Sequence, residues 1–570
     1  MNNPSMSAVP NRMLVLVGGL TAMMLAMLSS TIVSTAMPRI ATELNDLAHL
    51  SWIFTAYMLT STVTVPVIGK LSDIFGRRVI YLAAIAGFVA ASAAAGFSQT
   101  MFQLILCRAV QGVAGGALMV NTAAMIGDIF PPAERGKWQG VTGAVFGLAS
   151  GAGPLLRGWI TDALSWHWVF WVNVPFGILA FGVILGTLPK LPPRATKPTI
   201  DYAGAALLAL GLTPLLLSMV WGGSTYPWGS SIIWSLIAVG VVAIALFPWT
   251  ESRAKEPVLP LDLFRNRVFT ISSGVTMLSS MGMFGVLPFI PLYAQVVVGF
   301  SATNSGLVLT PMMVGVVLAS AIVGQVVSRT GKYRVMAILG MSVATLGMFL
   351  FTRVSIDTGA SQLVTAMFVT GLGLGATMPI FGVVVQNAFD HSRLGVVTAS
   401  TQLFRTIGGT VGSALFGGIL NARIADGLAP LANDPFLQRL SALLPGAARG
   451  PLNANAIQGV LGTRGQEALS AAIARLPADM QAQVVPQMQH FLMEVKIVIN
   501  DAIGFVFVGG AVLMALATIV TVFLPQLALQ KTNRRPAEEA GMELEAELGQ
   551  LDAAREPDLT GKWPAGARLR

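Results

Sequence analysis

Fourteen long apolar stretches limit what this 570-residue chain can fold into more than any other feature. Each holds about 20 residues, the length that an α-helix needs to cross the roughly 30 Å hydrocarbon core of a bilayer. In lipid the backbone must satisfy its own hydrogen bonds, so stretches of this kind form helices. Hydrophobic residues make up 54% of the chain and charged residues only 11%. We therefore expect an all-α polytopic membrane protein. The fourteen stretches begin near Met13, Ser51, Val79, Met101, Gln139, Trp166, Ala203, Ile232, Thr270, Asn304, Val335, Gln362, Val396 and Ala502.

The short loops carry an asymmetric charge that predicts the topology. With a cytoplasmic N-terminus, sixteen Lys and Arg residues fall in inside loops, and only Arg39 and Arg353 fall in short outside loops. This positive-inside bias predicts that both termini are cytoplasmic and that the number of spans is even. The first stretch lacks a clear small-residue cleavage site, so we interpret it as a retained span and not a signal peptide. The net charge of +9 is dispersed over these loops, which argues against nucleic acid as a partner.

A weak internal repeat predicts two halves. Gly69–Arg77, after span 2, is echoed by Gly324–Lys332, after span 10. Two six-helix halves with two extra spans between them explain this spacing, and transporters built this way bind their substrate between the halves near the midplane. The predicted ranges are a cytoplasmic N-terminus (1–12), a first bundle (13–188), a linker with two extra helices (189–268), a second bundle (269–526) and a disordered cytoplasmic tail (527–570).

The second bundle includes an extracytoplasmic loop, residues 421–495. Leucines at helical spacing near Leu437–Leu444 and Leu469–Leu476 predict short amphipathic helices there. Two interpretations remain open for this loop: a surface decoration, or a cap or lipid-contacting arm over the outer mouth.

The loop after span 2 carries charges that a simple positive-inside loop does not need. Gly69 and Gly76 permit a tight turn, and Asp73 and Arg77 are four residues apart, which lets them pair on one helix face. With Arg78, this segment resembles the signature between helices 2 and 3 of the major facilitator superfamily. Asp73 and Asp128 lie at the cytoplasmic edge, and we interpret them as gate residues that would alternate as partners of Arg77. The predicted gating residues are Gly69, Asp73, Gly76, Arg77, Arg78 and Asp128.

Spans 1, 4 and 5 add three further resemblances. The stretch Leu28–Pro38 resembles the span-1 motif of fourteen-helix drug:proton antiporters, and Arg108 stands where the span-4 motif of the family has an arginine linked to proton transfer. Many relatives carry an acidic residue where this chain has Ser29. The span-5 segment resembles the antiporter motif of exporters, although Arg157 replaces a glycine. The residues matching that motif are Gly151, Gly153, Pro154, Arg157 and Gly158.

Coupling and cargo residues are predicted from polarity and depth. No carboxylate lies mid-span in the first half, so Asp501, at the outer start of span 14, is the candidate membrane carboxylate, with Arg405 as its possible partner. Together with Arg108 they form the predicted coupling set. A drug cavity needs adaptable apolar walls with a few polar anchors. The candidate lining residues are Met23, Met27, Ser29, Ser30, Gln111, Phe284, Tyr293, Gln386 and Gln402; packing in the core explains the methionines and aromatics equally well.

These observations predict a secondary transporter and not an enzyme. The chain has no Gly-x-Ser-x-Gly motif and no phosphate loop, and its one Cys and four His show no metal-ligand spacing. We expect no cofactor and no metal, with a proton gradient as the energy source. The expected activity is export of amphipathic, cationic or neutral toxic compounds in exchange for protons, by alternating access, from a monomer in the cytoplasmic membrane. The alternatives are an exporter of a lipid or other endogenous metabolite, and a non-transporting membrane sensor.

Overall fold

The computed structural model describes residues 11–31, 52–189, 200–223, 225–300, 308–356, 360–390, 393–433 and 478–529, with single residues between 40 and 49. Within the helix α6, side chains are described only as far as Ala149.

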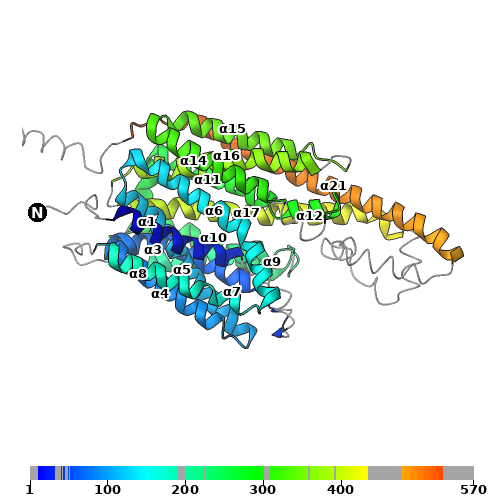
Figure 1. The fold of residues 1–570 in the computed structure, drawn as a ribbon, viewed down its shortest axis with the longest axis horizontal. Helices are drawn as coiled ribbons and strands as arrows, with labels where there is room; N and C mark the ends of the chain where they lie inside the picture. Colours follow the sequence, from blue (N-terminus) through cyan, green and yellow to red (C-terminus); the bar gives the residue numbers. More distant parts are fainter. Residues whose placement is uncertain are drawn as a thin grey trace, which may run out of the picture.

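The described chain is helical and its long helices lie side by side (Figure 1). Thirteen spans in it are long and apolar enough to cross a membrane, where α7 with α8 and α11 with α12 each count as one. The predicted fifth span is α6, a helix of 32 residues with a polar first turn. The predicted all-α polytopic fold with fourteen membrane helices is thus confirmed. The elements are α1 (Arg12–Thr31), α3 (Trp52–Phe75), α4 (Arg77–Ala95), α5 (Met101–Ile129), α6 (Pro132–Ala163), α7 (Trp168–Trp171), α8 (Asn173–Thr187), α9 (Tyr202–Trp221), α10 (Ser231–Glu251), η2 (Leu261–Arg265), α11 (Arg267–Val286), α12 (Phe289–Val296), α14 (Thr310–Thr330), α15 (Tyr333–Phe351), α16 (Ala360–Asn387), α17 (Leu394–Leu428), η4 (Pro430–Asn433) and α21 (Ala478–Val522).

Two buried apolar clusters organise the bundle. One draws on residues between 15 and 188, from α1, α4, α5 and α8, and the larger one draws on residues between 268 and 524. The helices α3 and α6 pack against the first cluster through Ile68 and Trp138. They form two seams with the second half of the chain, where α3 contacts α17 and α6 contacts α14. We infer that these clusters are the cores of the two predicted bundles, whose limits stay a prediction.

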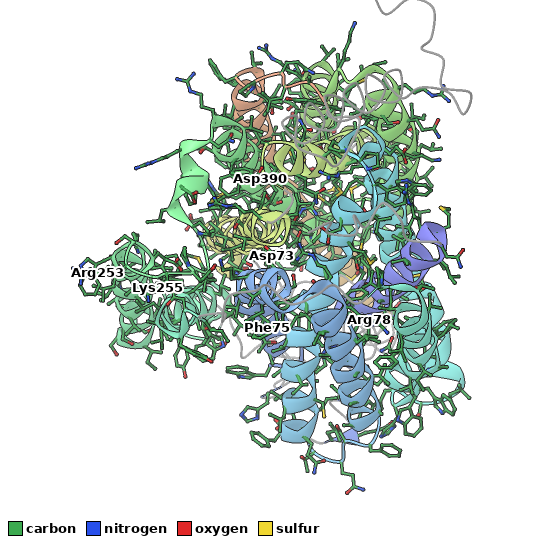
Figure 2. All side chains as sticks on the ribbon, turned by 90° about the vertical axis from the view of Figure 1, so that its left-hand side faces the viewer. Asp73, Phe75, Arg78, Arg253, Lys255 and Asp390 are labelled. Atoms are coloured by element: carbon green, nitrogen blue, oxygen red, sulfur yellow. The ribbon has the colours of Figure 1, made fainter. Side chains whose placement is uncertain are left out.

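The helices α9 and α10 form an antiparallel pair beside the bundle. They pack on each other, and α9 also contacts α3 and α17. Figure 2 looks onto the end of the molecule that carries Arg78, Arg253 and Lys255, with this pair to one side. We call this the inner end, because the positively charged loops predict that it faces the cytoplasm.

The predicted loop 421–495 is shorter in the structure, because helices extend into it from both sides. The helix α17 continues to Leu428, and α21 begins at Ala478 instead of near Ala502. The first half of α21 buries Val484, Phe491 and Val495 on one face. A helix that packs against protein needs only one apolar face, whereas a membrane span is recognised by hydrophobicity on all sides. The first half of α21 was therefore not predicted as part of a span. The predicted amphipathic helices near residues 437–444 and 469–476 lie outside the described residues.

Two glycines of the repeat take up the same unusual backbone conformation. Gly76 joins α3 to α4 with φ of 90°, and Gly331 joins α14 to α15 with φ of 66°. These are equivalent positions in the two copies. Positive φ is costly for residues with a side chain, so both junctions depend on glycine.

We predict that Gly76→Ala destabilises the protein by about 1–2 kcal/mol. A methyl group at this position would touch nothing within 4 Å, so the backbone conformation alone sets the cost. Gly274→Ala is the matched control, because Gly274 also faces open space but lies within the helix α11. That change should stabilise the protein by about 0.5–1 kcal/mol. Thermal unfolding in detergent measures both, and equal melting temperatures for the two variants would contradict the prediction.

Candidate functional site

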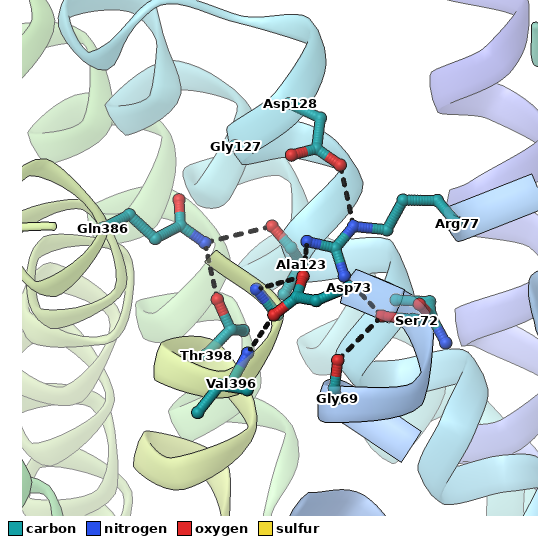
Figure 3. Close-up of polar contacts among 12 residues, drawn as sticks. Gly69, Ser72, Asp73, Arg77, Ala123, Gly127, Asp128, Gln386, Val396 and Thr398 are labelled. Carbon is teal, nitrogen blue, oxygen red and sulfur yellow. Dashed lines mark hydrogen bonds and ion pairs between the residues drawn. The ribbon is translucent and has the colours of Figure 1, made fainter. Parts of the chain in front are cut away.

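A buried cluster of charges lies at the inner end, where α3, α4 and α5 meet. Arg77 lies between two carboxylates: its Nη2 is 2.5 Å from Asp73 Oδ1, and its Nε donates to Asp128 Oδ2 at 2.8 Å. Arg77 also donates to Ser72 Oγ. Arg77 is 5% exposed and Asp128 4%. Figure 3 shows these contacts. We call Asp73, Arg77 and Asp128 the inner charge cluster.

Asp73 connects this cluster to a helix more than three hundred residues away in sequence. Its Oδ1 accepts the backbone N–H of Gly395 at 3.1 Å, and its Oδ2 accepts that of Val396 at 2.9 Å. Both groups belong to the first turn of α17, whose own preceding residue supplies no side-chain cap. A carboxylate at a helix N-terminus satisfies free N–H groups and interacts favourably with the helix dipole. The α3–α17 seam is therefore closed at the inner end by a charged cap.

Of the other predicted gating residues, Gly69 lies at this contact and Arg78 lies away from it. Gly69 faces α17 directly, and a methyl group there would come within 2.8 Å of Gly395 O. Arg78 points elsewhere, because its Nη2 donates to Leu185 O at 2.7 Å and connects α4 to α8. Asp73, Arg77, Asp128 and Gly69 thus come together at the seam, and Arg78 does not.

Arg135, one of the sixteen Lys and Arg residues of the predicted inside loops, also belongs to this region. It is 3% exposed and donates to Gly127 O at 2.7 Å and Phe130 O at 3.0 Å. Its Nη1 also reaches Gln386 O, on α16, at 3.5 Å. The helix breaker Pro131-Pro132 just before it was the available signal, since it places Arg135 in the first turn of α6, next to the carbonyl groups that end α5.

Arg108 occupies a second buried polar site, in the first half of the chain. It donates to Ser29 Oγ at 2.8 Å, Ile53 O at 3.1 Å and Gln111 Oε1 at 3.0 Å. Its guanidinium also lies 4.3 Å from the centre of the Tyr57 ring. The structure thus places Arg108 against span 1. Among the described residues no carboxylate contacts it, which agrees with Ser29 standing where relatives have an acid.

A central cavity of about 120 Å³ lies between α5, α6, α11, α16 and α17. Phe284, Gln386, Gln402 and Arg405 line it, and Arg405 is its single charged lining residue. Gln386 joins the two halves at its floor, because its Nε2 donates to Ala123 O and to Thr398 Oγ1, both at 3.1 Å.

Several predicted lining residues lie elsewhere. Met23 and Met27 pack with Ala149 in a small buried cluster. Tyr293 is 1% exposed, and its hydroxyl donates to Asn500 Oδ1 at 3.0 Å. Ser29 and Gln111 hold Arg108, and the Ser30 side chain lies outside the described residues. Aromatic and methionine side chains pack in cores as readily as they line cavities, so sequence alone could not separate the two cases.

A second cavity, of about 300 Å³, lies in the outer half of the molecule between α3, α9 and α17. Its walls include Phe54, Met58, Met219 and Asn421. It holds no charged lining residue and none of the predicted site residues.

The structure separates the predicted pair Asp501 and Arg405. Arg423 on α17 lies 3.9 Å from the ring of Phe505 on α21, so Asp501 lies near that level or further out. Arg405 precedes Arg423 by eighteen residues, or about 27 Å along the helix. Asp501 is exposed and contacts Asn500, its own neighbour. The sequence indicates that both residues belong to the second half, but it does not give their depths in the membrane. The reason is that α21 begins at Ala478, well before the apolar stretch from which the depth of Asp501 was predicted.

The span-5 residues Gly151, Gly153, Pro154, Arg157 and Gly158 lie within α6. Their side chains lie outside the described residues, so the role predicted for Arg157 stays a prediction.

Comparison with known proteins agrees with this geometry. Residues 19–413 match the family described as Major Facilitator Superfamily. The chain belongs to the Major Facilitator Superfamily. It is accordingly a multi-pass membrane transporter and not an enzyme.

Two relatives in this superfamily come from Bacillus subtilis. The chain is 38% identical to multidrug transporter protein MdtP over 93% of its own length and 96% of that protein. It is 36% identical to multidrug resistance protein 3 over 71% of its length and 78% of that protein. The crystal structure of the human organic anion transporter MFSD10 is similar in fold, with a TM-score of 0.54 and 14% identity, covering 91% of this chain and all of that one.

We predict that Asp73→Asn opens the inner end. The change removes the ion pair with Arg77 and the charged cap of α17, and loss of one partner from a buried pair costs about 3–5 kcal/mol. Phe75, exposed at the inner end of α3, is a suitable reporter. In a Cys107→Ser, Phe75→Cys, Arg329→Cys background, spin labels at the two cysteines should separate on Asp73→Asn.

The matched control is Asp262→Asn. It breaks the Asp262–Arg393 bridge, also 2.5 Å long and also at the start of α17, but half-exposed. Exposed ion pairs contribute about 0–1 kcal/mol, so this variant should leave the label distance unchanged. An equal response in both variants would mean that burial of the Asp73 contact does not matter.

Proposed function

We propose that this protein exports amphipathic drug-like compounds across the cytoplasmic membrane in exchange for protons. The observation that carries this proposal is its similarity, over nearly the whole length of both chains, to a multidrug transporter. We further propose that it works as a monomer, with both termini in the cytoplasm, as the loop charges predict.

Alternating access is the mechanism that the seams support. The α3–α17 seam closes at the inner end through the Asp73 cap, and the central cavity lies beside it. At about 120 Å³ this cavity is smaller than the sites of about 300–1,000 Å³ that hold drug-sized ligands. The two halves must therefore move apart to load cargo, and breaking the Asp73 contacts is the step that would open the inner end.

The positive charge of Arg405 in the central cavity limits which classes of compound this cavity would bind. Arg405 lines it and has no ion-pair partner among the described residues. A cationic compound in this space would be repelled by the guanidinium, and an acidic compound would be attracted. We therefore propose neutral and anionic amphipathic cargo, in place of the cationic or neutral cargo expected from sequence.

The proposed export is driven by proton exchange. Arg108, Arg405 and Asp501 are its predicted coupling residues. The exposed position of Asp501 suits a group that exchanges protons with the outer solution, and Arg108 and Arg405 would adjust their surroundings as the halves move.

We predict that Arg405→Gln weakens export of anionic compounds by about tenfold or more, because 1.4 kcal/mol of lost attraction corresponds to a factor of ten. Export of neutral compounds should change little. Everted vesicles that carry the protein, energised by a proton gradient, measure both with fluorescent anionic, neutral and cationic compounds of similar size.

Gln402→Ala is the control, since it removes a neighbouring polar lining residue without changing charge. An equal loss for all three classes in Arg405→Gln would refute the assigned cargo charge. Unchanged uptake of every compound by wild-type vesicles, with altered lipids in a deletion strain, would favour the lipid exporter instead.

A further inference from the structure

Two acidic side chains meet at the inner end of the α9–α10 pair, outside the site described above. Asp201 directly precedes α9 and Glu251 ends α10, so the antiparallel packing of these helices brings them together. Both face Gly204: a methyl group on this glycine would collide with Asp201 Oδ2 and come within 2.8 Å of Glu251 Oε1. The absence of a side chain at Gly204 leaves the space that the two carboxylates share.

In each carboxylate, one oxygen accepts a hydrogen bond and the other does not. Asp201 Oδ1 accepts the Gly204 N–H at 2.8 Å, and Glu251 Oε1 accepts the Leu259 N–H at 3.4 Å. Asp201 Oδ2 and Glu251 Oε2 are both buried and have no hydrogen-bond partner within the described part of the chain. Glu251 is 3% exposed. Buried polar atoms are rarely left without a partner, so both oxygens need an explanation.

Asp201 Oδ2 and Glu251 Oε1 meet at Gly204, and a proton on either carboxylate supplies the donor that this space lacks. Two ionised carboxylates in one buried space repel each other, so one of them takes up a proton. A protonated carboxyl group gains an O–H donor, which can be given to the other carboxylate.

We propose that Asp201 and Glu251 together bind one proton from the inner solution, and that this site controls how firmly the α9–α10 pair holds the inner end closed. The proposal does not require any particular cargo, or proton-driven export.

The charged groups around the pair favour one negative charge and not two. Lys70, on α3, acts electrostatically on Glu251, and it is already bound to Glu256 at 2.5 Å. Arg253 and Lys255 are exposed at the surface, where solvent screens them. With Asp262 bound to Arg393, these groups leave no free buried cation beside the pair among the described residues.

The segment 252–265 connects this site to the inner seam. It follows Glu251 directly, and Leu259 within it is held by the Glu251 carboxylate. From the same segment Glu256 binds Lys70 on α3, and Asp262 binds Arg393 at the start of α17. It therefore touches both helices that Asp73 joins. When the proton leaves, repulsion between the carboxylates displaces Glu251, and the segment loses its attachment at Leu259.

Infrared difference spectroscopy of the full-length protein, recorded between acidic and alkaline pH, tests for the shared proton. We expect a carbonyl-stretching band of a buried protonated carboxyl group that disappears as the pH rises. Glu251→Gln should lack it. Asp201→Asn should lose or shift it while keeping the helix cap, because asparagine caps as well as aspartate. Glu256→Gln, a change on the same segment, should retain it. Identical spectra in all four proteins would overturn the proposal.

The spin-label pair at residues 75 and 329 tests the connection to the seam. In the Cys107→Ser background without cargo, the label distance should increase as the pH rises past the loss of the band. Glu251→Gln should remove this dependence, and Glu256→Gln, which cuts the contact of the segment with Lys70, should weaken it. A distance that follows pH equally in wild type and Glu251→Gln would show that the pair does not control the seam. Drug export need not be measured, so a failure here is separate from a failure of the proposed export activity.

Discussion

The contact between the Asp73 carboxylate and the first turn of α17 holds the described conformation together. It is a charge-assisted bond in a buried setting, where hydrogen bonds to charged groups are strongest and their loss is most costly. Arg77 makes it stable, because a lone buried carboxylate would otherwise take up a proton or recruit water. Asp128 forms the second ion pair of Arg77. Arg77 would therefore keep a carboxylate partner if the Asp73 contacts broke. In the gating mechanism that we propose, the same three residues would hold the inner end closed and permit it to open.

Close helix packing makes this contact geometrically possible. At the α3–α17 seam Gly69 lies against Gly395, and at the α6–α14 seam Gly136 and Gly324 bring two backbones together. Small residues let helices approach in lipid, where no hydrophobic force drives them together. Gly69 and Gly324 are equivalent in the sequence repeat, and each lies where its half meets the other. The repeat thus marks the two surfaces that must separate and rejoin if the halves rock.

Local patterns in the sequence predicted the helices and the Asp73–Arg77 pair, because both depend on residues close together along the chain. Asp73 and Arg77 are four residues apart and pair as predicted, although Gly76 places them on two helices and not on one helix face. The apolar stretches are continuous. Contacts between distant residues were not predictable in the same way. Nothing near Asp73 in sequence indicates Gly395, and Arg135 resembles any loop arginine until Gln386 is placed beside it. Asp501 and Arg405 were wrongly brought together, because the depth of Asp501 depends on where α21 begins. The first half of α21 has a single apolar face, and its own sequence does not indicate which part of the chain packs against that face.

The length of α21 has a mechanical consequence. Its 45 residues extend about 68 Å at 1.5 Å per residue, roughly twice the thickness of the hydrocarbon core. Figure 1 shows it reaching well past the ends of most other helices. Because its membrane half packs within the second cluster, any tilt of that cluster carries the far half as a rigid arm. The displacement of a rigid helix grows with distance from the point about which it rotates. A small rotation near the midplane therefore moves the tip of α21 further than any part of the membrane half.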